Sequence, residues 1–149
     1  MKKNLSTLFA LMMAVISCTA AFAQDTTQEP AIGGYSPVSY FTENKAERGS
    51  PEFAVEHKGE TYFLTSKAQV TLFAENPDRY RPKYKACPFS LAHGMVLPLD
   101  PTNFKIIGDH LLLFHKSEEK DALLEWNSSE LSEKELLRRA DSNLFLIEF

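Results

Sequence analysis

Three side chains that can bind a soft metal ion lie close together in the segment KYKACPFSLAHGMVLP. Cys87 is followed six positions later by His93, and Met95 comes two positions after that. Thiolate, imidazole and thioether ligands select Cu(I) or Zn(II) over Mg²⁺ or Ca²⁺. The segment therefore predicts a metal site built on Cys87, with His93 or Met95 as the assisting ligand and copper or zinc as the ion.

The residues around Cys87 give a reason why its thiol could be reactive. Pro88 is a favoured first residue of a helix and Gly94 a favoured stop, so a short helix through about His93 would have Cys87 at its N-cap. That end of a helix favours the thiolate, which is the nucleophilic and metal-binding form. Positions six apart on a helix lie about 240° apart around its axis, so chelation by Cys87 and His93 requires Cys87 to turn back over the helix, or a ligand from elsewhere. Further candidate ligands are His57, His110 and His115, each more simply explained as a surface or hairpin residue.

Two alternatives remain open for Cys87. The first is thiol chemistry, in a redox protein or thiol-dependent enzyme whose cysteine forms a mixed disulfide or a sulfenic acid. The second is a structural or interaction module with a buried, inert cysteine, because cysteine often packs as a small hydrophobe. A Cys–His catalytic pair would also need an orienting third group and an oxyanion site, and the sequence has no recognisable signature of either. We therefore expect a binding module rather than an enzyme.

The N-terminus predicts export. Two lysines precede an apolar run from Leu8 to Ile16, and Ala21-Phe22-Ala23 is a small-x-small cleavage site, so we expect a signal peptide over residues 1–23. The apolar run is too short for a membrane span. The expected location is periplasmic or secreted, with a lipoprotein anchored through Cys18 as the alternative. Because Cys18 is then removed or lipidated, Cys87 has no partner for a disulfide within the mature chain.

The composition of the chain fits a single core and argues against a nucleic-acid partner. About 125 residues remain after the signal, which is one domain's worth. The formal net charge is −4, which argues against a nucleic-acid partner. The basic stretch RYRPKYK at 79–85 alternates with tyrosines and a proline, which is typical of a solvated loop.

The pattern of apolar residues predicts a small α+β domain built from β-hairpins, each followed by a helix. After a flexible lead-in over 24–31, Ser36 is expected to cap a short helix. Residues 53–64 read as a hairpin, and Ser66 with Gln69 has the spacing of a helix-capping box. A second hairpin turns at Gly108-Asp109, and Ser117 is expected to cap the helix after it. The last residues, LFLIEF, could dock as a strand or stay loosely attached.

Several of these segments together resemble one known family. GGYSPVSYF, GSPEFAVEHKGETYFLTS and FAENPDRYRPKYKACPFSLAHG are similar to the longer, exported bacterial branch of the YHS-domain family, which has a single Tyr-x-x-Cys motif. The resemblance covers residues 32–126, which leaves 127–149 as a C-terminal helical extension. It implies a small α+β fold and a role in handling heavy metals, but no established activity. The paired cysteines of the shorter relatives correspond here to Thr65 and Gln69, so only Cys87 matches a family cysteine.

Overall fold

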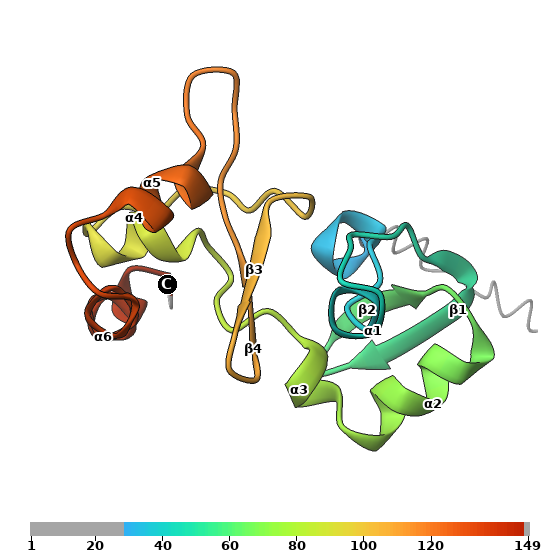
Figure 1. The fold of residues 1–149 in the computed structure, drawn as a ribbon. Coiled ribbons are helices and arrows are strands. Elements are labelled where there is room, and N and C mark those ends of the chain that lie inside the picture. The colour runs from blue at the N-terminus through green and yellow to red at the C-terminus, as the bar shows by residue number, and fades with distance from the viewer. Residues whose placement is uncertain (1–28, 148–149) are drawn as a thin grey trace, which may run out of the picture.

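The computed structural model describes residues 29–147. They form an N-terminal half over residues 31–80 and a C-terminal half over residues 88–147, joined by residues 81–87 (Figure 1). The predicted signal peptide, Cys18 and most of the lead-in lie outside the described residues. Each half contains an antiparallel hairpin followed by helices, so the expected α+β class is confirmed. The elements are η1 (Ala31–Gly34), α1 (Ser39–Thr42), β1 (Ser50–His57), β2 (Glu60–Leu64), α2 (Lys67–Glu75), α3 (Pro77–Tyr80), α4 (Pro88–Ala92), β3 (Phe104–Ile107), β4 (His110–Leu113), α5 (Ala122–Ser128), α6 (Glu133–Ser142) and η2 (Leu144–Ile147).

The first hairpin and its helix lie where the sequence predicts them. β1 and β2 are antiparallel, with Val55 opposite Tyr62. Lys58 and Gly59 form the turn, and their φ values of 51° and 78° are those that a two-residue hairpin turn of the primed type needs. α2 contacts both strands, and Phe73 on its inner face is fully buried against Tyr62. This half therefore has an apolar cluster of its own.

The cap of α2 is present, but Gln69 does not complete the capping box. The Ser66 hydroxyl accepts the N–H of Gln69 at 3.3 Å, as expected. The Gln69 side chain turns inward instead, where its Oε1 accepts from the Ser36 hydroxyl at 2.7 Å and the Thr65 N–H at 3.1 Å. Its Nε2 donates to Ser39 Oγ at 3.0 Å. The prediction that Ser36 caps α1 is wrong, because the hydroxyl of that residue is committed to Gln69 and no side chain caps α1.

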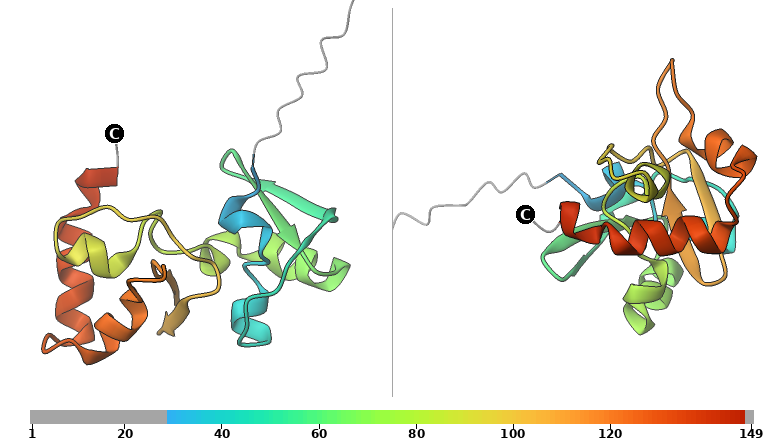
Figure 2. Two further views of the ribbon diagram at one scale, coloured as in Figure 1. Left: turned by 90° about the horizontal axis from the view of Figure 1, so that it is seen from above. Right: turned by 90° about the vertical axis from the view of Figure 1, so that its left-hand side faces the viewer.

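In the second hairpin, β4 is buried on both faces from Leu111 to Leu113 and packs against both halves, whereas β3 is half-buried. Successive residues of a strand point to opposite faces. Leu111 and Leu113 pack with Tyr40 of the N-terminal half, whereas Leu112 and Phe114 pack with the C-terminal helices. This explains the uninterrupted apolar run LLLF in place of an alternating one. Figure 2 shows the two halves side by side.

The cap of α5 differs from the prediction. Ser117 lies in a turn, where its hydroxyl accepts the N–H of Lys120 at 3.2 Å. The helix begins at Ala122, and the Asp121 carboxylate caps it by accepting from the N–H groups of Leu123 and Leu124. The prediction that Ser117 caps this helix is therefore wrong, because a tight turn separates it from the helix.

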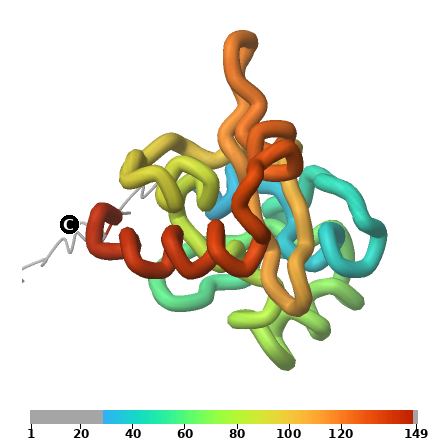
Figure 3. The backbone as a smooth tube through the Cα atoms, turned by 60° about the vertical axis from the view of Figure 1, so that its left-hand side comes forward, coloured from blue at the N-terminus to red at the C-terminus, as the bar shows by residue number. Residues whose placement is uncertain are grey.

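The C-terminal extension is part of the core of the second half. α6 runs along α4 (Figure 3), and Leu136 and Ala140 on its inner face are fully buried. The chain then forms the 3₁₀ turn η2 where a strand or a loose tail was expected. Leu144 and Ile147 lie three apart, on one side of this turn, and pack against the same apolar cluster. Among residues 29–147, no helix has the length and apolar character to cross a membrane.

Candidate functional site

Cys87 is the N-cap residue of α4, as the Cys-Pro sequence predicts, and its side chain is fully buried. Its carbonyl accepts the N–H of Leu91 at 3.0 Å, and its N–H donates to the carbonyl of Leu97 at 3.0 Å. The sulfur makes no capping hydrogen bond within the described chain. It belongs to an apolar cluster with Tyr84, Leu91, Leu112, Phe114, Trp126, Leu136 and Ala140. The backbone at Cys87 thus begins the helix, while the thiol is enclosed where α4, α5 and α6 meet.

The other end of α4 has the geometry that Gly94 predicts. The N–H of Gly94 donates to the carbonyl of Leu91 and the N–H of Met95 to that of Ser90, both at 2.9 Å. With φ of +73° at Gly94, these two bonds form a Schellman motif. The expected short helix and its stop are therefore confirmed.

His93 and Met95 are exposed, in contrast to Cys87. The Nδ1 of His93 lies 2.8 Å from the carbonyl oxygen of Phe89, and the two rings are 4.5 Å apart between centroids. Met95 is 48% exposed. The three predicted ligands thus lie on one short segment, but the structure does not bring the thiol to the surface where the other two are.

The remaining histidines lie in separate places. His57 is 3.3 Å from Asp78, His115 Nδ1 is 3.1 Å from the carbonyl of Pro98, and His110 is exposed at the start of β4. Within residues 29–147, no group of three or more His, Cys, Asp or Glu side chains is arranged to hold a metal ion. Each of these histidines is accounted for as a hairpin or loop residue.

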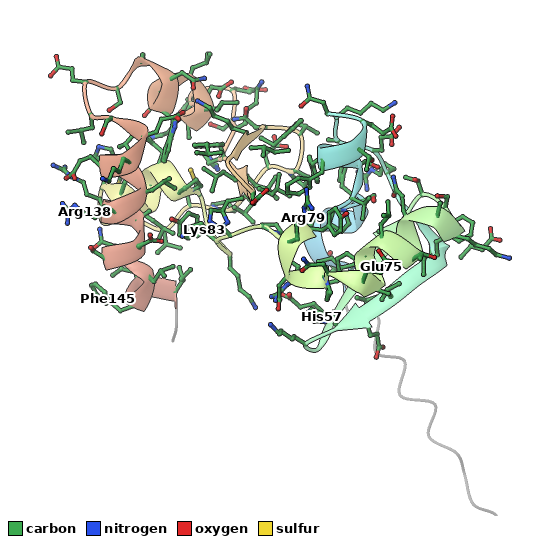
Figure 4. The ribbon with its side chains drawn as sticks, turned by 60° about the horizontal axis from the view of Figure 1, so that its bottom comes forward. His57, Glu75, Arg79, Lys83, Arg138 and Phe145 are labelled. Carbon is green, nitrogen blue, oxygen red and sulfur yellow. The ribbon has the colours of Figure 1, made fainter. Side chains whose placement is uncertain are left out.

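A pocket of about 270 Å³ lies where the N-terminal half meets the segment between α3 and α4. Figure 4 shows this segment crossing between the halves, with Lys83 labelled on it and Arg79 labelled on α3, which precedes it. The pocket is lined by Ala31, Ile32, Glu60, Tyr62, Arg81, Pro82, Tyr84, Lys85 and Leu99. Its walls combine apolar side chains from three separate segments with a small set of charged groups.

The charged groups form one hydrogen-bonded network around Arg81. The guanidinium donates from Nε to the Tyr62 hydroxyl at 2.9 Å, from Nη2 to Glu60 at 3.3 Å and from Nη1 to Asp78 at 3.0 Å. The Tyr62 hydroxyl donates to Glu60 at 2.7 Å. Lys85 Nζ lies 3.1 Å from the other oxygen of Glu60. Arg81 is therefore held in place by three partners, whereas Lys85 is paired only with Glu60 among the described residues.

These contacts set the charges inside the pocket. Burial alone would raise the pKa of Glu60, but hydrogen bonds from Tyr62 and Lys85, together with the charges of Lys85 and Arg81, lower it below its usual value. Burial, helped by the bond to Glu60, raises the pKa of Tyr62 to about 12. At neutral pH the lining thus carries two cations, one carboxylate and the neutral phenols of Tyr62 and Tyr84.

The sequence reading missed this pocket. It treated RYRPKYK as a solvated loop, but Tyr80 and Tyr84 of that stretch are buried while Arg81 and Lys85 line the pocket. The available signal was the two tyrosines themselves, because aromatic side chains bury large apolar areas and are frequent in cores. The apolar walls carry no comparable signal, since they come from distant parts of the chain.

Comparisons of the chain with protein-family models, with curated proteins and with solved structures found no match. The resemblance to YHS-domain proteins therefore stays a prediction from the quoted motifs. The backbone N–H of Thr65 donates to the side-chain oxygen of Gln69 at 3.1 Å.

Proposed function

We propose that the protein is an exported, non-catalytic binding module of the YHS kind, in which Cys87 is a packing residue. The observation that carries the packing role is the full burial of the Cys87 side chain in an apolar cluster to which α6 contributes Leu136 and Ala140. A thiol acts as a nucleophile or soft-metal ligand in its ionised form, and burying an ion among apolar side chains is costly. The surroundings of Cys87 therefore oppose what its N-cap position alone would favour.

Soft-metal binding through Cys87, with His93 or Met95, is the second candidate. The observation in its favour is local, because Cys87 begins α4 while His93 and Met95 follow its last residue with exposed side chains. A local unwinding of this five-residue helix is the change that would bring a thiolate to the other two donors. Copper or zinc would then be the ion, as the donor set requires.

Alkylation of the thiol separates these candidates. We expect iodoacetamide to react slowly with Cys87 in the native chain that begins at Gln24, at a rate set by opening of the fold, and rapidly in urea. A Cys87→Ala variant, which has no thiol left to alkylate, is the blank. Fast native alkylation below neutral pH would overturn the packing role and favour a redox thiol.

Metal titration gives the second readout. Under anaerobic conditions, Cu(I) and Zn(II) are competed against a chromophoric chelator with wild type and Cys87→Ala. Equal binding by the two proteins is the expected result and ends the thiol-site hypothesis. Loss of one metal equivalent in Cys87→Ala would contradict the packing role and support the metal site.

A further inference from the structure

The pocket between the halves has the size and surface of a site for a small molecule. Its volume is about 270 Å³. This lies near the lower end of the ~300–1,000 Å³ usual for ligand sites. Ala31, Ile32, Pro82 and Leu99 supply apolar walls on both sides of the charged group. A ligand of about ten non-hydrogen atoms with an apolar body would fill this space.

The polar side of the pocket has more hydrogen-bond donors than acceptors. A guanidinium has five N–H donors and an ammonium three. Arg81 uses three of its donors on Tyr62, Glu60 and Asp78, and Lys85 uses one on Glu60. Among the described residues, the other two donors on each cation are without a protein partner. The site is therefore suited to a group that only accepts hydrogen bonds.

Charge points to the same kind of group. The lining carries Arg81 and Lys85 against Glu60, and Asp78 beside the pocket is shared between Arg81 and Lys58. The three cations of this cluster therefore exceed its two carboxylates by one positive charge. Glu60 accepts bonds on both oxygens, from Arg81 and Tyr62 on one side and Lys85 on the other. A ligand anion would thus approach the cations rather than the already occupied carboxylate. Ionic hydrogen bonds of this kind are among the stronger ones in proteins.

Lys85 is the group that can turn towards a ligand. Its side chain is 71% exposed, whereas that of Arg81 is 20% exposed and fixed by three bonds. The lysine ammonium sits on a flexible four-carbon stem, so it can reach a ligand at the pocket mouth while Arg81 keeps its network. Arg81 would then donate hydrogen bonds from a fixed position, and Lys85 would adjust its position to the ligand.

We propose that this pocket binds a small monocarboxylate with an apolar body, whose carboxylate bonds to Lys85 and to the unoccupied donors of Arg81. The apolar body would lie against Ile32, Pro82 and Leu99. This ligand class deepens the binding-module function and rests on it, but it does not involve Cys87.

The test is an NMR titration of the ¹⁵N-labelled native chain. The probes are phenylacetate, 3-phenylpropionate and hexanoate, each beside its neutral amide and its ammonium counterpart. We expect at least one carboxylate to give saturable shifts of the amide signals of β2 and of residues 81–85, and to bind at least about tenfold more tightly than its amide or ammonium form.

Two matched variants test the role of Lys85. Lys85→Met removes the charge from an exposed side chain and is expected to weaken carboxylate binding at least about tenfold, as loss of an ionic hydrogen bond would. Lys67→Met makes the same change at an exposed position of α2, away from the pocket, and should leave binding unchanged. The proposal is overturned if no carboxylate in the set shifts these signals, if an amide or ammonium form binds equally well, or if both variants bind like wild type. None of these outcomes depends on alkylation or metal binding at Cys87, so the two proposals can fail separately.

Discussion

Ser39 and Ser90 are both fully buried serines in short helices, but their hydroxyls have different surroundings. Ser39 Oγ accepts from the side-chain amide of Gln69 at 3.0 Å. Ser90 Oγ has no hydrogen-bond partner among the described residues. A buried polar group without a partner costs free energy, whereas a bonded one is close to neutral or favourable. The same residue type thus has opposite effects on stability at the two positions.

We expect Ser90→Ala to stabilise the protein by about 1 kcal/mol, because it removes an unpaired hydroxyl and places a better helix former in α4. Ser39→Ala is the matched change and should cost about 1–2 kcal/mol, since it leaves the Gln69 amide without its acceptor. Urea unfolding of both variants measures these differences in the free energy of unfolding. A Ser90→Ala protein less stable than wild type would show that its hydroxyl has a partner, such as an ordered water.

A second residue-level prediction concerns acid stability. Hydrogen bonds from Lys58, His57 and Arg81 hold the pKa of Asp78 well below its ordinary value of 3.8. A carboxylate with a lowered pKa contributes stability that is present above its unfolded-state pKa and lost as the pH falls towards the folded value. Asp78→Asn should therefore lose less stability than wild type between about pH 5 and about pH 2. Urea midpoints across that range provide the measurement, and parallel curves for the two proteins would contradict the prediction.

At the scale of elements, side-chain caps mark where α2 and α5 begin. Ser66 and Asp121 each accept backbone N–H groups in the first turn of their helices, α2 and α5. Both are short polar residues of the type that favours the N-cap position. Ser117 has the same chemistry, but its hydroxyl serves a turn instead.

Paired alanine variants distinguish the two candidate caps of α5. Asp121→Ala should cost about 1–2 kcal/mol, because it also removes the acceptor of the Asn103 amide, bonded at 2.9 Å. Ser117→Ala should change the free energy of unfolding by less than about 0.5 kcal/mol, as is usual at an exposed position. Thermal or urea unfolding compares them, and equal losses would mean that both residues cap the helix.

At the scale of the whole molecule, the β3–β4 hairpin makes the two halves depend on each other. Leu111 belongs to the cluster shared with the N-terminal half and Leu112 to that of the C-terminal helices. Neither half can lose the hairpin without exposing apolar surface on the other side. Unfolding should therefore be a single cooperative transition.

Two substitutions on opposite faces of β4 test this dependence. Leu111→Ala and Leu112→Ala are each expected to cost about 2–5 kcal/mol, as for other large-to-small changes in a core. In both variants, urea unfolding is measured with two probes: the fluorescence of Trp126 reports on the C-terminal half, and NMR signals from β1 and β2 report on the N-terminal half. The two probes should give the same transition. If Leu111→Ala shifts the β1–β2 transition and leaves that of Trp126 in place, the halves unfold independently.

The sequence predicted the elements well where the signals were local. The turns at Lys58-Gly59 and Gly108-Asp109, the Ser66 cap and the short helix after Cys87 all depend on a few adjacent residues. The roles of Ser36 and Ser117 were mispredicted because their hydroxyls found other partners in the folded chain.

The surroundings of Cys87 and the pocket depend on distant segments and could not be read from local patterns. Leu136 and Ala140, which belong to the same apolar cluster as Cys87, are more than forty residues away in sequence. The pocket walls likewise join Ile32, Tyr62 and Leu99, which no periodicity links. Such sites form only when distant segments pack together, so the local patterns that predict helices and strands do not predict them.

The position of α6 at the far end of the chain has a consequence for the order of events. While the protein is being made from its N-terminal end, Cys87 emerges before Leu136 and Ala140 of α6, which belong to the same apolar cluster, so its sulfur is less enclosed during that interval. A shortened protein ending at Trp126 would lack α6, and the sulfur of its Cys87 would stay more accessible to an oxidant. Disulfide-linked dimers of such a fragment would then result from the absence of α6 and would not indicate a reactive thiol in the intact chain.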